Sequence, residues 1–365
     1  MAIPVLHGVV GTRPNMMKMA SLARALAEDG TFELRLVHTG QHYDERMSGV
    51  FFDELGLPEP AHRLGSGSGS QGAQTARILT AYEEVLLAER PRGVVVVGDV
   101  TSTMACALAA AKLGVSVAHV EAGLRSGDRA MPEEINRVVT DALADLLLVS
   151  DPDGLGHLAR EGRPREAVRY VGNVMVDTLL RELPAARDSN LLARLGLAPG
   201  HYAYLTLHRP SNVDDPAVLR GLLGAAAEIA RETPVLFAVH PRTRARMAQV
   251  GLPDPPAAGI LAVEPLGYRD SLRAIQCARA VLTDSGGIQE ESSVLRVPCL
   301  TLRWNTERPV TVELGSSELV GNDPERIRVA WRRLRDGRWK QAADIPLWDG
   351  HAAERVVRCL REVWQ

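Results

Sequence analysis

Short apolar runs of strand length alternate with longer helical patterns along the whole chain. This alternation is typical of parallel α/β architecture, because a parallel strand can follow another only after a crossover, usually a helix. The first half contains apolar runs at residues 3–10, 33–38, 93–97, 115–120 and 145–149, with helical patterns at 15–28 and 103–113. The second half contains runs at 203–207, 234–239, 259–263, 280–282 and 298–302. The sequence therefore predicts two Rossmann-like, doubly wound domains.

The length of 365 residues also favours two domains over one. We place an N-terminal domain at residues 1–180 and a C-terminal domain at residues 185–350. The last helical pattern, at residues 351–365, lies beyond the second series of strands. We expect this helix to pack back on the first domain.

Composition and charge argue against several classes of protein. The net charge of −3 and the aromatic content of 4% do not suit a nucleic-acid binder, which usually has a basic excess. No stretch approaches the roughly 18 apolar residues of a membrane helix, and the N-terminal apolar run lacks the basic leader of a signal peptide. The four cysteines form no CxxC pair, which favours reduced thiols. We expect a cytoplasmic protein with neither nucleic-acid nor membrane partners.

Polar residues that follow the predicted strands are the first candidates for a binding site, because ligands of open parallel sheets bind outside the carboxyl ends of the strands. The first strand leads into Gly11-Thr12-Arg13-Pro14, and Lys18 follows one turn into the helix. Glycine permits close approach of a ligand, and Arg13 and Lys18 suit a phosphate. The segment matches neither the GxGxxG nor the GxxxxGKS loop, so an ordinary turn with solvated cations is the alternative.

Carboxylates follow two further strands of the first half. Asp99 follows the third apolar run and Glu121 follows the fourth, so the two side chains could face one cleft. Each carboxylate could instead cap a helix. Glu133 and Arg137 come next, four residues apart on one helix face, and the alternative for this pair is a surface ion pair.

Histidines end two strands of the second half. His208 and Arg209 follow the first strand of that half, and His240 follows the second. A histidine at a strand end can serve as acid, base or anion partner, although a lone one is more often structural. Arg308, in the segment TERP, offers a further cation.

The strongest signal is TDSGGIQEE at residues 283–291, where a strand runs into Ser285-Gly286-Gly287 at the start of a helix. Backbone N–H groups and the helix dipole at such a point can hold a phosphate. One turn later, Glu290 or Glu291 could accept hydrogen bonds from the two hydroxyls of a ribose. Together with the carboxylates of the first half, this segment indicates an enzyme of nucleotide sugars with its cleft between the domains.

The order of these motifs resembles a known family. GTRP, TGQH, GDV, HVEAGLRSGD, MPEEINR, LHRP, TDSGGIQEE and TERP occur here in the order seen in the non-hydrolysing UDP-N-acetylglucosamine 2-epimerases, and the resemblance extends from residue 11 to residue 356. It implies a glycosyltransferase-B-like pair of domains with an interdomain cleft, and a homodimer. It also implies inversion at C2 of UDP-GlcNAc to give UDP-ManNAc, with no metal and no other cofactor.

The chemistry of that family implies anti elimination of UDP to a 2-acetamidoglucal, followed by re-addition of UDP. This route needs a base near C2, an acid that returns the proton, and stabilisation of the departing UDP. The resemblance assigns the catalytic roles to Asp99, Glu121, Glu133 and His208, with His208 near the diphosphate. The residues assigned to UDP are Arg13, Lys18, Arg137, Arg209, Ser285, Gly286, Gly287, Glu291 and Arg308. Within this set we expect Glu291 to hold the ribose, while Arg13 and the amides of residues 285–287 neutralise the diphosphate.

The chain departs from the family pattern at several positions beside the expected cleft. Asn15 replaces the glutamate of GTRPE, Val310 replaces that of TERPE, and Pro210, Ser211 and Asn212 replace part of HRxEN. These changes put the identity of the substrate in question more than the type of reaction.

Bacterial members of the family are activated by their substrate at a neighbouring site. The residues expected at such a site here are Gln41, His42 and His240, but the Gly/Ser-rich segment 64–72 occupies the stretch where an activating arginine is expected. A segment of this composition is usually a mobile surface loop. We therefore expect weak activation or none.

Four functions remain open from the sequence. The favoured one is an epimerase of UDP-GlcNAc, or of a modified 2-acetamido sugar such as a diacetamido uronic acid, that supplies a cell-surface glycan or a specialised sugar pathway. The others are a hydrolysing epimerase that releases ManNAc, a glycosyltransferase of the same fold, and a binding module without catalysis.

Overall fold

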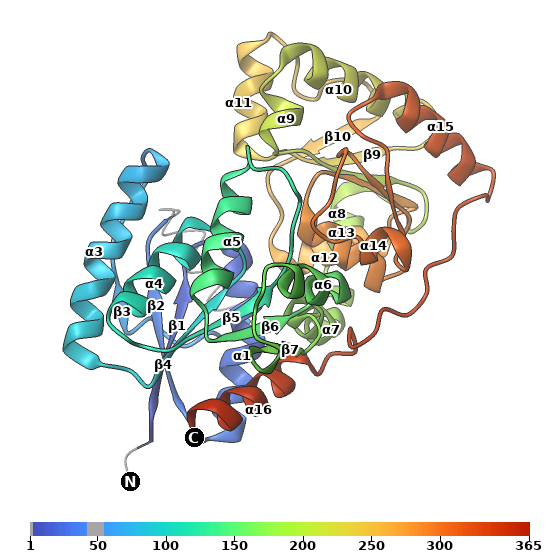
Figure 1. Ribbon diagram of the computed structural model, residues 1–365. Helices are drawn as coiled ribbons and strands as arrows, with labels where there is room; N and C mark the ends of the chain where they lie inside the picture. The colour runs from blue at the N-terminus through green and yellow to red at the C-terminus, as the bar shows by residue number, and fades with distance from the viewer. Residues whose placement is uncertain (1–2, 42–54) are drawn as a thin grey trace. The chain divides into compact units, whose positions relative to one another are not determined.

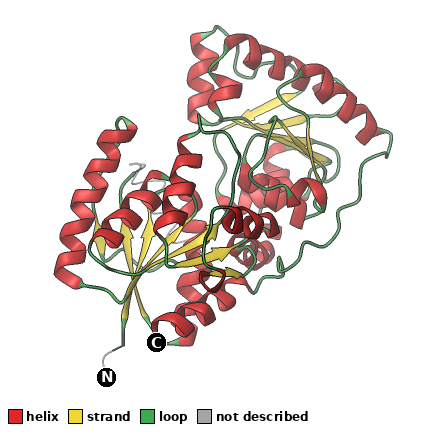
Figure 2. Ribbon diagram, in the orientation of Figure 1, coloured by secondary structure: helices red, strands yellow, loops and turns green. Residues whose placement is uncertain are grey.

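The computed structural model describes residues 3–41 and 55–365. The chain divides into two units, one formed by residues 1–180 with 346–365 and the other by residues 181–345. Each unit contains one parallel β-sheet with helices packed on both of its faces (Figure 2). The predicted fold class, two doubly wound α/β domains, is therefore confirmed.

The sheet of unit 1 has seven strands in the order β3-β2-β1-β4-β5-β6-β7. Their bounds are β1 Val5–Val10, β2 Glu33–His38, β3 His62–Arg63, β4 Gly93–Val97, β5 Val117–Ala122, β6 Leu146–Val149 and β7 Val168–Tyr170. The helices of this unit are α1 Arg13–Asp29, α3 Gln71–Glu89, α4 Thr101–Lys112, α5 Pro132–Leu143, α6 Pro152–Arg160 and α16 Ala352–Trp364, with a short 3-10 helix at Arg165–Ala167. Helix α7, Val174–Arg187, leads from unit 1 into unit 2.

Strand β4 lies at the centre of this sheet and is buried on both faces, as its sequence GVVVV predicts. Val94 and Val96 face a core that α3 and α4 complete. On the opposite face, the indole of Trp364 in α16 packs directly over Gly93, where a Cβ would come within 2.6 Å of the ring. Helices α16 and α1 pack against each other on that side (Figure 1), and Arg361 of α16 pairs with Asp29 of α1 at 3.0 Å.

The sheet of unit 2 has six strands in the order β10-β9-β8-β11-β12-β13. Their bounds are β8 Ala203–Thr206, β9 Val235–Ala238, β10 Ile260–Val263, β11 Ala280–Thr283, β12 Cys299–Thr301 and β13 Ser317–Leu319. The helices are α8 Leu191–Leu195, α9 Pro210–Val213, α10 Pro216–Ala230, α11 Pro241–Gln249, α12 Tyr268–Gln276, α13 Gly286–Val294, α14 Val310–Glu313 and α15 Pro324–Arg335. Apolar side chains of α10 and α15 fill one face of the sheet.

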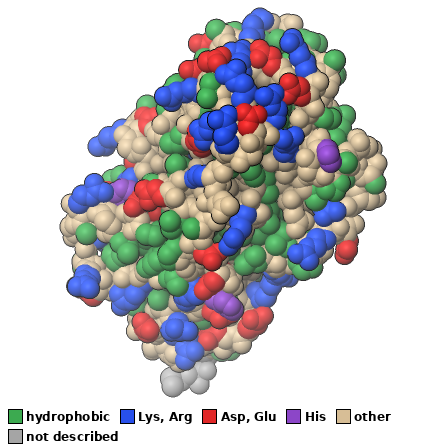
Figure 3. All heavy atoms as spheres, turned by 90° about the vertical axis from the view of Figure 1, so that its right-hand side faces the viewer, with side chains coloured by type: hydrophobic (Ala, Val, Ile, Leu, Met, Phe, Trp, Pro, Cys, Tyr) green, Lys and Arg blue, Asp and Glu red, His purple; other side chains and the backbone are tan. Residues whose placement is uncertain are grey.

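The surface of unit 2 carries many arginines interspersed with acidic side chains, as the upper part of Figure 3 shows. Three arginines of α15 illustrate the pattern, because Arg328, Arg333 and Arg335 pair with Glu228, Glu318 and Glu232. The charge of these cations is therefore largely compensated within the unit.

The ten predicted strands all correspond to observed strands, and their limits differ by a residue or two. The prediction missed β3, β7 and β13, which are short and lie at sheet edges. Within the described residues, no helix has the length and apolar character needed to cross a membrane.

Candidate active site

The carboxyl ends of β1, β4 and β5, three neighbouring strands of unit 1, bring together Asn15, Lys18 and Glu121. Lys18 lies one turn into α1, and its ammonium donates a hydrogen bond to the carboxylate of Glu121. Both side chains are buried. Asn15 donates to the carbonyl of Val97 at 2.7 Å and accepts from Thr12 at 2.9 Å, so its amide fastens α1 to the end of β4.

The backbone of Glu121 is the most unusual feature of this strand end. The pairing of β5 with β6 shifts between Val120 and Ala122, so Glu121 is the extra residue of a β-bulge. Its φ of 75° lies in the left-handed region, which costs a non-glycine residue about 1–3 kcal/mol. Bulges turn a strand side chain in a new direction, and this one directs the carboxylate of Glu121 to Lys18.

Asp99 follows β4 and is bound by Arg137 of α5, whose guanidinium donates to its carboxylate. The same guanidinium donates through Nε and Nη2 to Glu134 at 3.0 and 2.8 Å. Arg137 is only 1% exposed. The alternative considered for this residue, a surface ion pair, is therefore wrong, because Arg137 is a buried bridge between the carboxylates of Asp99 and Glu134.

Glu134 is a residue of this site that the sequence analysis did not single out. The backbone amides of Ser126 and Gly127 donate to its two carboxylate oxygens, each at 2.9 Å. Burial alone would raise the pKa of Glu134, but the Ser126 amide and the Arg137 guanidinium outweigh it and lower that pKa. Its neighbour Glu133, the predicted catalytic carboxylate, is half-buried in the first turn of α5.

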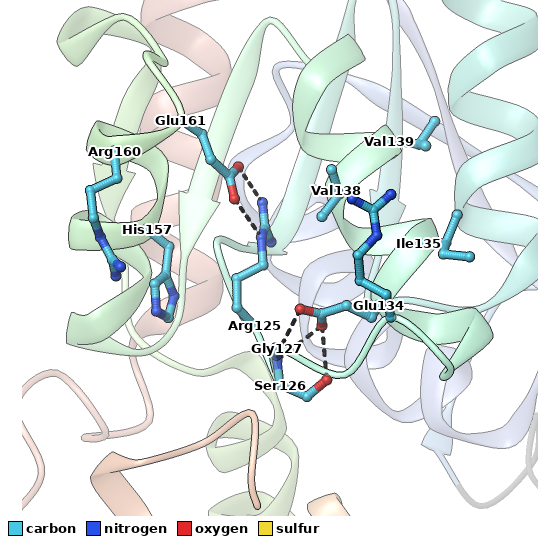
Figure 4. Close-up of a pocket in the computed structure, with 11 residues that line it drawn as sticks. Arg125, Ser126, Gly127, Glu134, Ile135, Val138, Val139, His157, Arg160 and Glu161 are labelled. Carbon is cyan, nitrogen blue, oxygen red and sulfur yellow. Dashed lines mark hydrogen bonds and ion pairs between the residues drawn. The ribbon is translucent and has the colours of Figure 1, made fainter.

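The loop that holds Glu134 also borders a cavity of about 600 Å³ on unit 1. Figure 4 shows the two bonds from the 126–127 amides to Glu134, and beside them the fork of Arg125 on Glu161, at 2.8 and 2.6 Å. Val138 and Ile135 of α5 form an apolar part of the lining.

In unit 2, Asp284 at the end of β11 organises the segment that contains His208. Its buried carboxylate accepts from the backbone amides of His208 and Arg209 at 3.0 and 2.9 Å, and it lies 2.7 Å from Nδ1 of His208. Burial alone would raise the pKa of Asp284, but the His208 ring and these amides lower it to about 2. The His208 side chain is 39% exposed, so its Nε2 side is the part of the ring that is left for a ligand.

The predicted phosphate segment lies where α13 begins. Ser285 is the N-cap, and its hydroxyl accepts from the amide of Ile288 at 3.5 Å. A Cβ on Gly286 would come within 2.7 Å of Arg308 and 2.9 Å of Glu307. A larger residue would displace the ends of these two side chains, so glycine preserves the close approach of the helix start to Arg308.

Three arginines gather around the buried carboxylate of Glu307. Arg303 and Arg308 lie 2.6 Å from its oxygens and Arg209 lies 3.3 Å away. Burial opposes the charge of Glu307, but these cations hold its pKa well below the usual range. Arg308 also donates to Glu290 at 2.5 Å. Because three guanidinium groups face two carboxylates, net positive charge remains, which suits a diphosphate.

The other residues predicted to bind UDP lie at the starts of α1 and α13 or within α13. Arg13 is half-buried at the first position of α1. Glu290 and Glu291 are both buried on α13, and Glu290 accepts a hydrogen bond from Arg308. Gly287 is the second residue of α13.

Two of the three predicted regulatory residues lie within the described part of the chain. Gln41 accepts from the backbone amide and the hydroxyl of Ser102 at the start of α4, at 3.1 and 2.7 Å. The ring centroid of His240 lies 5.6 Å from that of His208. His42 lies outside the described residues.

The Gly/Ser-rich segment 64–72 is bound to the helix that follows it. Arg77 of α3 donates to the carbonyls of Ser66 and Ser68 at 2.6 and 2.9 Å, and Gln74 donates to that of Gly67 at 2.6 Å. An arginine therefore does lie against this segment, although it comes from the helix and not from the segment.

One group among the described residues has the composition of a metal site. The ligand atoms of His7, His62 and Glu89 lie within 4.8 Å of one another. Arg35 lies 3.2 Å from the carboxylate of Glu89, and a cation in that position competes with a metal ion. Asp99 and Glu121 are each bound to a cationic side chain as well.

The sequence and the fold of this chain are similar to those of known proteins. A family model described as UDP-N-acetylglucosamine 2-epimerase matches residues 24–361. The UDP-N-acetylglucosamine 2-epimerase of Methanocaldococcus jannaschii is 42% identical over 361 residues, which cover 96% of this chain and 97% of that protein. The UDP-2,3-diacetamido-2,3-dideoxy-D-glucuronate 2-epimerase of Pseudomonas aeruginosa is 40% identical over 359 residues, or 97% of this chain and 99% of that protein.

A crystal structure of the M. jannaschii enzyme in complex with UDP-GlcNAc and UDP is similar to this fold. The TM-score is 0.91 at 41% sequence identity, and the match covers 98% of this chain and 99% of that chain.

Proposed function

Because the chain belongs to the UDP-N-acetylglucosamine 2-epimerase family, we propose that it inverts C2 of a UDP-2-acetamido sugar without hydrolysing it. The substrate we favour is UDP-GlcNAc and the product is UDP-ManNAc. The observation that carries this proposal is the two ion pairs at the ends of adjacent strands, the buried pair of Lys18 with Glu121 and the pair of buried Arg137 with half-buried Asp99. The two cations fix the carboxylates in place at the edge of the sheet where ligands bind, and a fixed carboxylate is a candidate for proton transfer.

The proposed reaction has two steps. In the first, a carboxylate of the set Asp99, Glu121 and Glu133 takes the C2 proton while the C1–O bond breaks, which yields a 2-acetamidoglucal and UDP. In the second, a phosphate oxygen of UDP re-forms the bond to C1, and a proton is delivered to the opposite face of C2. One proton is removed and one is added, and the leaving group is returned, so neither an oxidant nor water is consumed.

We assign the stabilisation of departing UDP to unit 2. The diphosphate of UDP needs cations that are already in place when the C1–O bond breaks. The arginines around Glu307, the start of α13 and His208 provide such an electropositive region. His208 is held by Asp284 through Nδ1, so its Nε2 can donate to the diphosphate.

Product analysis tests the non-hydrolysing assignment. Purified protein is incubated with UDP-GlcNAc, and the mixture is analysed by anion-exchange chromatography. Formation of intact UDP-ManNAc supports the proposal. Stoichiometric free ManNAc and UDP would instead show a hydrolysing epimerase.

A modified substrate is the second candidate, and two observations favour it. The P. aeruginosa relative is named as a diacetamido-glucuronate epimerase, and the uncharged Asn15 is buried where the family pattern has glutamate. Removal of a negative charge there would ease the binding of a sugar that carries a carboxylate. Comparison of kcat/KM for UDP-GlcNAc and for the diacetamido uronate decides between the two substrates.

We further propose a cytoplasmic homodimer that needs neither a metal nor a cofactor. Light scattering of the purified protein tests the dimer. Unchanged activity after dialysis against EDTA is the result expected for metal independence.

A further inference from the structure

A buried carboxylate beside the candidate site has no role in the reaction proposed above. Asp141 lies on α5 with no exposed surface. Its oxygens lie 2.6 Å from Nδ1 of His119, 3.0 Å from the amide of Gly123 and 2.7 Å from Arg125. Burial alone would raise the pKa of Asp141, but His119 and Arg125 lower it, so it is a carboxylate in the folded protein.

His119 connects this carboxylate to the neighbouring strand. It lies on β5, is fully buried, and its Nε2 lies 2.8 Å from the carbonyl oxygen of Gly98. Both ring nitrogens therefore face acceptors, the carboxylate of Asp141 on one side and a backbone carbonyl on the other. The ring therefore links Asp141 of α5 to the backbone that follows β4.

His119 binds the carbonyl of Gly98 and Asp141 binds the amide of Gly123. These two glycines lie close in sequence to the predicted catalytic residues. Gly98 directly precedes Asp99, and Gly123 follows Glu121 by two residues. Gly98, Glu121 and Gly123 all have positive φ, of 68°, 75° and 81°. A positive φ interrupts the regular extended conformation, so the side chains that bind these backbone groups help to define their position.

We propose that Asp141 and His119 are positioning residues that fix Asp99 and Glu121 relative to each other for the epimerisation. The inference rests on the proposed function. Because both side chains are fully buried and are bonded to the backbone, they act through the backbone next to the two carboxylates, at the end of β5 and after β4. Misplacement of reacting groups by about 1 Å can cost about 10²-fold in rate.

Three variants test the two connections separately. Asp141→Asn keeps an acceptor for the Gly123 amide but removes the charge. In His119→Asn the side-chain amide can still reach Asp141 but not Gly98. In His119→Gln the side-chain amide can occupy the place of Nε2 and donate to the Gly98 carbonyl. We expect kcat to fall about 10- to 100-fold in Asp141→Asn and His119→Asn, with partial rescue in His119→Gln. KM should stay within about threefold, because the residues assigned to UDP are not touched.

Asp145→Asn is the matched control. Asp145 also holds the backbone of β5, since it accepts from the amide of Val117 at 2.9 Å and from the hydroxyl of Ser116 at 3.0 Å. It does so at the amino end of the strand, whereas Glu121 lies near the carboxyl end. We expect this variant to lose stability but to keep the wild-type kcat.

Hydrogen exchange supplies a readout that does not depend on activity. Exchange of the Gly123 amide should accelerate in Asp141→Asn, because a neutral acceptor binds the amide less strongly than a carboxylate does, and it should stay at the wild-type rate in Asp145→Asn. If wild-type protein does not epimerise, the proposed function fails and this inference fails with it. If wild-type protein is active and the folded Asp141 and His119 variants keep its kcat, the positioning role alone is overturned. Should Asp141→Asn fail to fold, the order of kcat between His119→Gln and His119→Asn decides, and equal values contradict the proposal.

Discussion

Glu121 has a backbone φ of 75° and, from that bulged position at the end of β5, accepts a hydrogen bond from the ammonium of Lys18. A glutamate rarely occupies the left-handed region, because its Cβ is crowded there. The protein therefore retains a strained residue at the point where a carboxylate meets a buried cation, which is typical of functional sites.

This strain predicts an unusual order of stability for two substitutions of Glu121. Both Glu121→Gly and Glu121→Ala remove the carboxylate and leave Lys18 unpaired, so those losses cancel in the comparison. Glycine tolerates positive φ and alanine does not, so we expect Glu121→Gly to be more stable than Glu121→Ala by about 1 kcal/mol. Urea denaturation measures the difference. A Glu121→Ala variant as stable as Glu121→Gly would mean that the backbone is not strained.

The space around Lys18 predicts that arginine cannot replace it. Lys18 is one of three lysines in a chain with 42 Lys and Arg residues, and its Nζ lies 2.8 Å from the position of a Cβ on Gly98. A planar guanidinium is larger than an ammonium and does not fit such a space. We expect Lys18→Arg to lower kcat/KM by more than about tenfold.

The control for this experiment is Lys112→Arg, at the exposed end of α4. Its steady-state kinetics should match those of wild-type protein. Unchanged kcat and KM in Lys18→Arg would contradict the tight fit.

The contacts of Arg137 predict that lysine cannot replace it either. Its guanidinium reaches Asp99 and Glu134 at the same time, and a single ammonium cannot replace that fork. We expect Arg137→Lys to lower kcat about 10²-fold through displacement of Asp99. Arg129→Lys, at an exposed position of the preceding loop, should leave kcat unchanged. Near-normal turnover in Arg137→Lys would show that Asp99 does not need this bridge.

Asp284 predicts how stability depends on acid pH. Its pKa is lowered from 3.8 to about 2, so it stabilises the folded state fully above about pH 4, and this contribution disappears as the pH falls towards 2. We expect Asp284→Asn to be less stable than wild-type protein by about 2 kcal/mol at pH 7. The difference should shrink between pH 4 and pH 2. Urea denaturation at a series of pH values measures it, and a constant difference would contradict the lowered pKa.

The fold was predictable because its main signal is local. Ten apolar runs of strand length marked ten strands, since a strand buried on both faces needs a continuous run such as GVVVV in β4. Strand β3 contains only His62 and Arg63, and β7 and β13 contain three residues each. Their pairing depends on the neighbouring strand, and no hydrophobic pattern marks it.

Only part of the candidate site was predictable. Residues at strand ends, such as Asp99 and Glu121, could be selected because the carboxyl edge of a parallel sheet is where ligands bind. Glu134, Asp141 and Asp284 were missed because each is defined by what it binds in the folded chain. The bulge at Glu121 was equally hidden, because nothing in a glutamate indicates positive φ.

The most direct test of the proposed mechanism follows the C2 proton. Wild-type protein is incubated with UDP-GlcNAc in deuterium oxide, and the sugar ring is observed by ¹H NMR. We predict UDP-ManNAc that carries deuterium at C2 and still carries UDP, with the C2 proton signal of UDP-GlcNAc lost as the reaction reverses. Formation of UDP-ManNAc with protium retained at C2, or no change in either sugar, would contradict the mechanism.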